Sequence, residues 1–348
     1  PVGCTFNPET MRNEMTSFFD VALSPFAIDK FTHTVTSAWV LGAAFTVGVG
    51  CWYLLRRRHA ELATQSIKIG SIVGLAASFL AAFTGDNSAY MVAQTQPMKL
   101  AAMEALYEGG NSQGLTGIAF VNPFGQPDYM TDAEPPMRIA VPNMLSLLAT
   151  HDPDGFVPGV RDIIKGYPKA DGTQEPSLKE KQERGRKAIQ ALKDFRAGKD
   201  KEANRKVLER DMKYFGYGYI KDADQLVPFI PVNFWAFRIM VGLGALFILV
   251  FAVLLFVVYR KDITRPRWLQ MLGIALIPLA YIASESGWIV AEFGRQPWTI
   301  QDMLPTWAAV SDLSSGGIAF TFFLFLFLFT AMLAVEVSIM CKQIKKGP

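Results

Sequence analysis

The sequence predicts an all-α, polytopic transmembrane helix bundle with one large extramembrane loop domain. Hydrophobic residues make up 51% of the 348 residues and charged residues 19%, a mixture that fits a bilayer protein only if the charge is segregated. It is segregated, because five apolar segments are each long enough to cross a bilayer, for which roughly 20 residues suffice. The five segments are Phe31–Leu55, Ile67–Gly85, Asn233–Tyr259, Trp268–Glu292 and Gly317–Cys341.

The chain divides accordingly into four parts. Residues 1–30 mix Phe, Met, Pro and charge and are expected to form an outer loop. Residues 31–87 form a transmembrane helix pair, 88–232 a large loop, and 233–348 three transmembrane helices with short connections. The chain starts at Pro1 without a signal peptide, so we expect it to begin within a longer protein.

The large loop has an internal organisation of its own. Residues 109–175 are rich in Gly, Pro, Asn and Asp, which predicts irregular structure. Residues 177–215 are strongly helical in propensity and predict two charged helices that are broken near Gly198.

Basic residues predict the orientation of the chain. The segments "RRRH", "YRKDITRPRW" and "CKQIKKG" follow the first, third and fifth spans, so alternating spans bring all three to one side. Short loops rich in Lys and Arg stay in the cytoplasm, whereas long loops are exempt from this rule. The loop 88–232 is therefore expected to be periplasmic.

Composition excludes some classes of function. The net charge of +3 is small, and no exposed basic run is interleaved with aromatic residues, so nucleic-acid binding is not indicated. Cys4, Cys51 and Cys341 are far apart and form no CxxC pair, which argues against a disulfide framework or a zinc site.

Histidine and methionine mark the outer ends of two spans. His33, in "KFTHTV", is the intramembrane histidine, since His59 and His151 lie in extramembrane segments. It could be a haem ligand, a proton relay or a donor between helices. Met240, in "FRIMVG", lies at a similar depth; methionine usually serves packing, but a His/Met pair can hold haem iron. Arg238 could meet a haem propionate or extend to the outer surface.

Two carboxylates stand near the end of the fourth span, in "SESGWIVAEFGRQPW". Glu285 and Glu292 are seven residues apart and share a helix face with Trp288, while Arg295 follows at the mouth. Carboxylates are rare and costly within membrane helices. Glu292 is therefore either a helix-end carboxylate that touches water, an iron ligand, or a proton-carrying group beside a cofactor.

A further charged pair lies just beyond the second span, in "KLAAME". Lys99 and Glu104 are five residues apart, and such a pair usually lies on a solvated helix face. Here it stands where an amphiphilic ligand from the bilayer would meet the aqueous side, as does Asp86 in "GDNSAY".

Taken in order and with their separations, "KFTHTV", "GDNSAY…KLAAME", "FRIMVG" and "GWIVAEFGRQPW" resemble subunit I of cytochrome bd ubiquinol oxidase, in its long-loop class. The similarity runs over essentially the whole chain. It implies a membrane quinol oxidase that oxidises ubiquinol or menaquinol at the periplasmic side and passes electrons through two haems b to haem d. Dioxygen is reduced to water, and a proton-motive force results.

The resemblance also implies a setting. It places the chain in the bacterial inner membrane among lipid, with subunit II as partner, and leaves a small accessory subunit open. His33 and Met240 would be the axial ligands of the low-spin haem b, which Arg238 would tune. Lys99 and Glu104 would serve quinol oxidation.

Glu292 matches the iron ligand of the high-spin haem b, with Trp288 and Arg295 nearby. The family's chain begins with about four further helices, each long enough to cross the bilayer. They carry the histidine that ligates haem d and are absent here. The chain is thus expected to be the C-terminal portion of subunit I, with no haem d ligand and an incomplete activity of its own.

The alternative from another functional class is a secondary transporter with an intramembrane carboxylate and arginine in its substrate site. Such proteins often show internal repeats and broken helices. Neither is evident in the sequence, and a haem spectrum would separate the two possibilities.

Overall fold

The computed structural model describes residues 3–7, 10, 12–169, 171–260 and 262–347; Pro1 lies outside them. Five helices among these residues are long and apolar enough to cross a membrane. They are α2 (Pro25–Leu55), α3 (Ala60–Thr95), α9 (Ile230–Arg260), α10 (Arg267–Phe293) and α11 (Ser315–Lys346). The predicted all-α transmembrane bundle with five spans is therefore confirmed.

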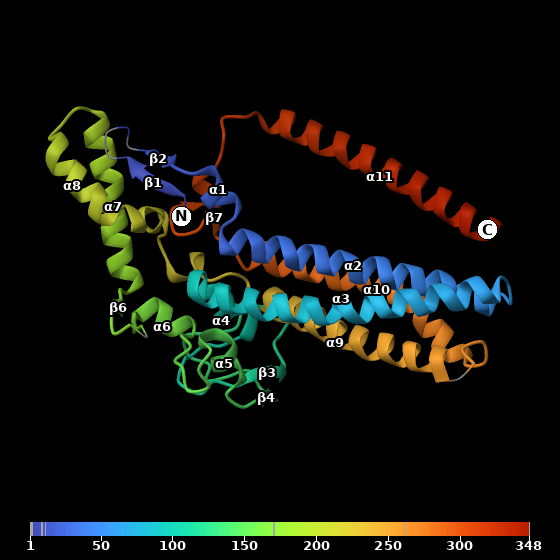
Figure 1. The fold of residues 1–348 in the computed structure, drawn as a ribbon. Helices are drawn as coiled ribbons and strands as arrows, with labels where there is room; N and C mark the ends of the chain where they lie inside the picture. The colour runs from blue at the N-terminus through green and yellow to red at the C-terminus, as the bar shows by residue number, and fades with distance from the viewer. Residues whose placement is uncertain (1–2, 8–9, 11, 170, 261, 348) are drawn as a thin grey trace.

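Helices α2, α3, α9 and α10 lie side by side as a bundle (Figure 1). Small residues allow the backbones to approach closely, as is typical of membrane helices. A Cβ added to Gly74 on α3 would lie 2.6 Å from the ring of Phe251 on α9, and one on Gly48 would lie 2.6 Å from Ile277 on α10. These glycines are therefore required by packing rather than by backbone conformation.

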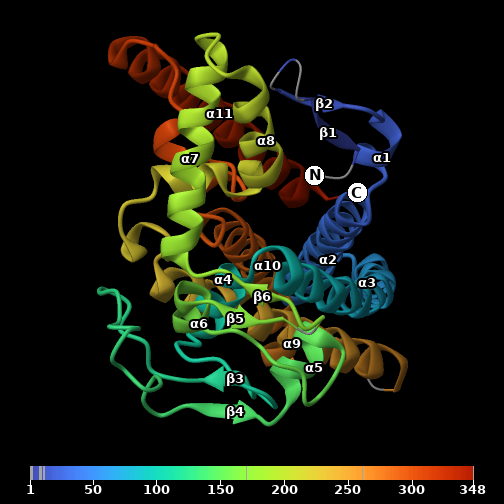
Figure 2. The same cartoon turned by 90° about the vertical axis from the view of Figure 1, so that its left-hand side faces the viewer.

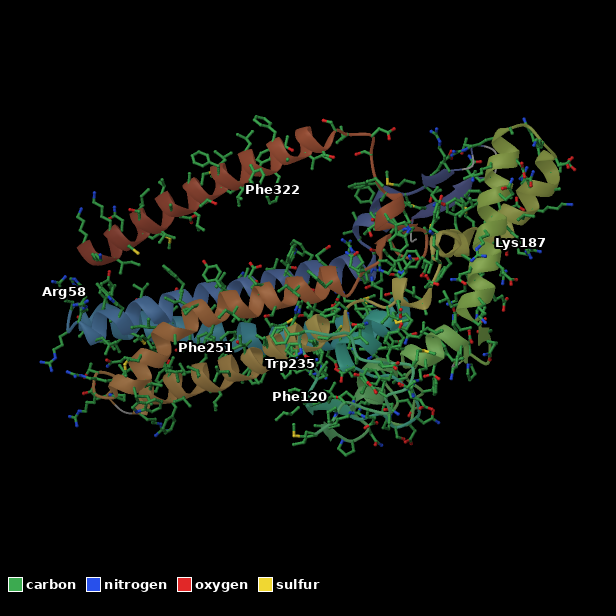
Figure 3. The ribbon with its side chains drawn as sticks, turned by 180° about the vertical axis from the view of Figure 1, so that it is seen from behind. Arg58, Phe120, Lys187, Trp235, Phe251 and Phe322 are labelled. Carbon is green, nitrogen blue, oxygen red and sulfur yellow. The ribbon has the colours of Figure 1, made fainter. Side chains whose placement is uncertain are left out.

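Helix α11 stands apart from the bundle along most of its length (Figure 1). Its side chains, such as Phe322, are almost all exposed (Figure 3). It approaches the bundle at its C-terminal end, where the Tyr53 hydroxyl donates to the Ile344 carbonyl oxygen at 3.0 Å.

The long loop and the basic segments lie at opposite ends of the bundle. In Figure 3, Arg58 marks the end where α2 turns into α3, and Lys187 marks the outer domain at the other end. The turn between α9 and α10 and the end of α11 lie on the Arg58 side (Figure 1). All three basic segments thus share one end, as the alternation of spans predicts.

The outer domain is built from short elements. The helices are α4 (Pro97–Glu104), α5 (Met144–Thr150), α6 (Val160–Lys165), α7 (Leu178–Arg196), α8 (Lys201–Asp211), η1 (Met212–Tyr219) and η2 (Ala223–Gln225). The antiparallel strand pairs are β3 (Leu115–Ile118) with β4 (Ile139–Val141) and β5 (Tyr167–Pro168) with β6 (Gln174–Glu175). Trp235 on α9 ties this domain to the bundle, because its Nε1–H donates to the Val121 carbonyl oxygen at 2.9 Å.

Smaller elements flank the bundle at the same end. They are β1 (Cys4–Asn7) paired with β2 (Arg12–Met15), α1 (Phe18–Ala22), β7 (Trp298–Ile300) paired with β8 (Leu304–Pro305), and η3 (Thr306–Ala308).

The two charged helices form the hairpin that the sequence predicts (Figure 2). Helix α7 begins where the Ser177 hydroxyl accepts from the Glu180 N–H, a favourable N-cap. It ends before Gly198, whose φ of +79° is a conformation that glycine adopts at little cost. The hairpin therefore follows from local signals.

Two expectations from the sequence need correction. The first span begins at Pro25 rather than Phe31, because the Ser24 hydroxyl caps it by accepting from the Ala27 N–H and proline suits the first helical position. The stretch 109–175 is not wholly irregular but contains short strands and helices. Elements of two to seven residues are too short to show a periodicity that sequence reasoning can detect.

Candidate functional site

Glu104 and Arg238 form a buried ion pair, although 134 residues separate them in the sequence. Glu104 ends α4 and is 2% exposed, and Arg238 lies on α9. Arg238 Nη2 is 2.9 Å from Glu104 Oε2. An unpaired buried charge is strongly destabilising. Each of these two residues can therefore be buried because the other neutralises its charge. Glu104 therefore does not lie on a solvated helix face.

Backbone groups complete the surroundings of Arg238. Its Nη2 also donates to the Thr116 carbonyl oxygen at 2.9 Å, and its Nη1 donates to the Met103 carbonyl oxygen. The Thr116 N–H donates to Glu104 Oε2 at 3.1 Å. Sequence reasoning missed Thr116, since only the approach of β3 to α9 in space gives it a role.

Two polar atoms of this cluster lack a partner among the described residues. They are Glu104 Oε1 and Arg238 Nε, and both are shielded from water. Leaving a buried polar atom unpaired is costly. A free carboxylate oxygen in this position suits a ligand that brings a hydroxyl group.

Lys99 lies on the same short helix and is 7% exposed. Its Nζ donates to the Ala291 carbonyl oxygen on α10 at 3.3 Å. A Cβ added to Gly294 would lie 2.8 Å from Lys99 Cγ and 2.9 Å from Asn233 Oδ1. The glycine after α10 thus makes room for the lysine, which joins α4 to the end of α10.

Burial disfavours the charged form of this lysine. It lowers the pKa of Lys99 to about 8, with the cations Lys30 and Arg295 lowering it further and Glu292 opposing them. A shift of this size corresponds to about 3 kcal/mol against the charged folded form.

Replacing Lys99 with Met should therefore stabilise the protein. The folded pKa is below the unfolded value, so the unfolded state binds more protons between about pH 8 and about pH 10, and stability rises with pH across that window. We expect Lys99→Met to unfold at a higher temperature than the wild type at pH 7, with a difference that shrinks toward pH 10. Thermal unfolding of the detergent-solubilised complex measures this.

Lys187→Met is the matched control, because Lys187 projects from the outside of α7 (Figure 3). It should leave the unfolding temperature nearly unchanged. A lower unfolding temperature for Lys99→Met at pH 7 would contradict a destabilising buried charge.

His33 is half-buried between α2 and α3, with its Nδ1 2.9 Å from Thr84 Oγ1. The Thr84 hydroxyl also lies 3.0 Å from the Leu80 carbonyl oxygen, and when it donates its single proton there it accepts from His33 Nδ1–H. The imidazole nitrogen Nε2 then carries the lone pair, which is the form that binds a metal. A Cβ added to Gly85 would lie 3.4 Å from His33 Cε1, so α3 leaves space for the ring.

Met240 is half-buried between α9 and α10. A Cβ added to Gly287 on α10 would lie 3.0 Å from Met240 Sδ, closer than side-chain contacts usually come. The glycine therefore leaves room for the thioether.

The two candidate ligands, His33 and Met240, lie at a similar depth. Thr84, beside His33, lies one turn inward from Ser88 on α3, whose hydroxyl accepts from Lys30 at 2.8 Å. Gly287, beside Met240, lies one turn inward from Ala291 on α10, whose carbonyl oxygen accepts from Lys99. The structure thus places both candidates one turn inside the charged outer end of the bundle.

Glu292, Trp288 and Glu285 occupy the last turns of α10. Arg295 Nη2 donates to Glu292 Oε2, and Trp288 is 61% exposed. Glu285 is exposed on the same face. This face of α10 is therefore left open by the described helices, and Glu292 keeps one oxygen without a partner among the described residues.

The sequence profile of the family described as cytochrome bd terminal oxidase subunit I matches residues 1–348. The chain belongs to this family. Family membership places it in an oxidoreductase of respiratory electron transport, for which haem and iron are expected, and does not favour a transporter.

Individual relatives agree. Cytochrome bd-II ubiquinol oxidase subunit 1 of Escherichia coli (strain K12) is 36% identical over 367 residues, which cover 100% of this chain and 68% of that protein. Cytochrome bd ubiquinol oxidase subunit 1 of Bacillus subtilis (strain 168) is 29% identical over 349 residues, which cover 100% of this chain and 62% of that protein.

The structure of bd oxidase from Geobacillus thermodenitrificans is similar with a TM-score of 0.72 and 20% identity. The match covers 100% of this chain and 64% of that chain. At this identity the likeness shows the fold alone. The chain thus spans about two thirds of the length of these relatives.

Proposed function

We propose that this chain carries the quinol-oxidising site and the two haems b of a quinol:oxygen oxidoreductase of the cytochrome bd type. The observation that carries the proposal is the convergence of the buried Lys99 and the Glu104–Arg238 pair at the outer end of the bundle, one turn from the level of His33 and Met240. Buried ionisable groups gathered beside candidate ligands are typical of a functional site.

The polar groups suit the head group of ubiquinol or menaquinol. Glu104 Oε1, left free among the described residues, would accept a hydroxyl proton of the quinol. Lys99 would donate to the second oxygen of the ring. Because Arg238 and Thr116 already bond Glu104 Oε2, the proton would arrive at Oε1 and leave toward the outer side.

His33 Nε2 and Met240 Sδ would hold the iron of a low-spin haem b. Hydrogen bonding sets the tautomer of His33, and glycines leave room beside both side chains. When bound, this haem would take the electrons of the quinol. Arg238, two residues before Met240 and paired with Glu104, would tune that haem electrostatically.

Glu292 would ligate the iron of the high-spin haem b, on the open face of α10. Trp288 would pack against that group, and Arg295 would bind it with its free, shielded Nε. Haem d and the reduction of dioxygen to water would lie beyond, with no residue of this chain assigned as the haem d ligand.

The membrane setting completes the proposal. Loop 88–232 would face the periplasm and the basic ends would face the cytoplasm of a bacterium, across its inner membrane. Quinol protons released outside and water protons taken from inside would generate the proton-motive force. Subunit II would be the partner, and a small accessory subunit would have a place in the same complex.

Replacing Glu104 with Gln tests this proposal. Gln keeps the shape and can still accept from Thr116, but it is no longer a proton acceptor of the same strength. We expect the rate of quinol oxidation in the complete complex to fall by about 100-fold, the usual size of a general-base contribution. Haem content, read from the reduced-minus-oxidised spectrum, should be unchanged.

Glu108→Gln is the matched control, since Glu108 lies in the same loop and is exposed, and among the described residues its side chain bonds only to Arg161. It should retain wild-type turnover. Normal turnover in Glu104→Gln, or loss of haem in that variant, would overturn the assignment of Glu104 to quinol oxidation.

A further inference from the structure

Thr116 stands between Glu104 and two arginines and uses every polar group it has. Its N–H donates to Glu104 Oε2 at 3.1 Å, and its carbonyl oxygen accepts from Arg238 Nη2 at 2.9 Å. Its hydroxyl oxygen accepts from Arg138 Nε at 3.0 Å. Thr116 is 4% exposed, so these contacts lie inside the protein.

Arg138 holds this part of β3 from the other side. Its Nη2 donates to the Gly114 carbonyl oxygen at 3.0 Å, and its Nη1 lies 2.7 Å from Oε1 of the exposed Glu134. Arg138 precedes β4, and the pairing of β3 with β4 is irregular between Thr116 and Ile118. Because the backbone pairing of β3 with β4 is irregular here, it does not by itself fix the position of Thr116. Side-chain hydrogen bonds, such as those of Arg138, are needed as well.

The orientation of the Glu104 carboxylate depends on Thr116. The terminal torsion of a glutamate is broad, so its two oxygens exchange places easily unless donors hold one of them. Arg238 Nη2 and the Thr116 N–H both donate to Oε2. Arg238 is held by the carbonyl oxygens of Met103 and Thr116, and the Thr116 N–H is fixed by the backbone. These two donors distinguish the occupied Oε2 from the free Oε1, and both depend on the position of Thr116.

We propose that Arg138 is a positioning residue that, through Thr116, keeps the Glu104 carboxylate turned so that Oε1 faces the quinol. This inference rests on the proposed role of Glu104. Arg138 touches neither Glu104 nor the substrate in this scheme, and its effect is exerted on the rate of proton acceptance rather than on the haems.

Arg161 offers a control of the same kind. It also donates to two backbone carbonyl oxygens of the outer domain, those of Tyr129 and Asp132, and meets an exposed glutamate, Glu108. Its side chain is 12% exposed, against 14% for Arg138. It bonds neither Thr116 nor Glu104. Its replacement therefore removes hydrogen bonds that stabilise the loop without changing the contacts that orient the Glu104 carboxylate.

The experiment compares Arg138→Met, Thr116→Val and Arg161→Met in the complete complex. We expect Arg138→Met and Thr116→Val to lower kcat for quinol oxidation by about 10-fold. This is the effect expected from the loss of one hydrogen bond next to charged groups. Haem content should stay constant, and guanidinium ion in solution should partly restore Arg138→Ala. Arg161→Met should keep the wild-type kcat. Equal losses in Arg138→Met and Arg161→Met would overturn the inference, because both would then be loop braces.

A double-mutant cycle with Glu104→Gln separates this inference from the proposed function. If Arg138 acts through Glu104, adding Arg138→Met to Glu104→Gln causes no further loss of kcat. If the two losses multiply while Glu104→Gln alone remains slow, the proposed function stands and the positioning role is overturned. If Glu104→Gln alone keeps full activity, the proposed function itself fails.

Discussion

Replacing His33 with Ala is expected to abolish the low-spin haem b signal in the reduced-minus-oxidised spectrum. With Nδ1–H donating to Thr84, His33 would present the lone pair of Nε2 to the iron, and haem iron held by a single methionine would lose its strong-field partner. His59 precedes α3 at the opposite end of the bundle and His151 follows α5 in the outer domain, so neither lies within a span where it could replace His33. The measurement is an optical spectrum of the purified complex.

His151→Ala is the control for this prediction. His151 stacks on Tyr90 with ring centroids 4.0 Å apart, at the surface where α3 meets α5, and its loss should leave the spectrum intact. Thr84→Val should give an intermediate result, since removal of a group that orients a ligand typically costs about 10-fold in affinity for the metal group. An unchanged spectrum in His33→Ala would remove His33 from the site.

The spans and the charged hairpin could be predicted because their signals are local. A long apolar run must become a helix in a bilayer, since no water is present to satisfy the backbone. The break after α7 likewise follows from Gly198 and from the cap at Ser177. The fold class therefore needed no knowledge of distant contacts.

The chemistry of the outer end could be predicted only in part. Lys99 and Glu104 were expected as a pair on one helix, but in the structure each finds its partner elsewhere. Glu104 meets Arg238, and Lys99 meets the carbonyl of Ala291. Such pairings depend on how α4 is laid across the ends of α9 and α10, and no residue near them in the sequence carries that information.

Arg238 illustrates the same limit. From the sequence it is an arginine near a candidate haem ligand, and its expected role was electrostatic. The structure adds that its guanidinium is committed to Glu104 and to two backbone carbonyls. It thereby links the proposed quinol site to α9, the helix that carries Met240. A substitution at Glu104 should therefore affect the surroundings of Met240, and a substitution at Met240 those of Glu104.

Replacing Glu292 with Gln is expected to remove or disorder the high-spin haem b and to stop oxygen consumption by the complete complex. Glu292 lies at the outer end of α10 with one oxygen bonded by Arg295 and the other free among the described residues. Gln is nearly isosteric but supplies no anionic ligand, so it should fail almost as badly as Ala. Haem content and oxygen uptake are the two measurements.

Glu285→Gln is the matched control on the same helix. Glu285 lies two turns deeper on the same face and is exposed, and among the described residues it forms no ion pair like that between Glu292 and Arg295. Its replacement should be much milder. If Glu292 were only a helix-end carboxylate in contact with water, Gln would be tolerated there too, because its amide still bonds to water and to Arg295 through its carbonyl oxygen. Full haem content and normal oxygen uptake in Glu292→Gln would therefore establish the helix-end role and rule out iron ligation by this residue.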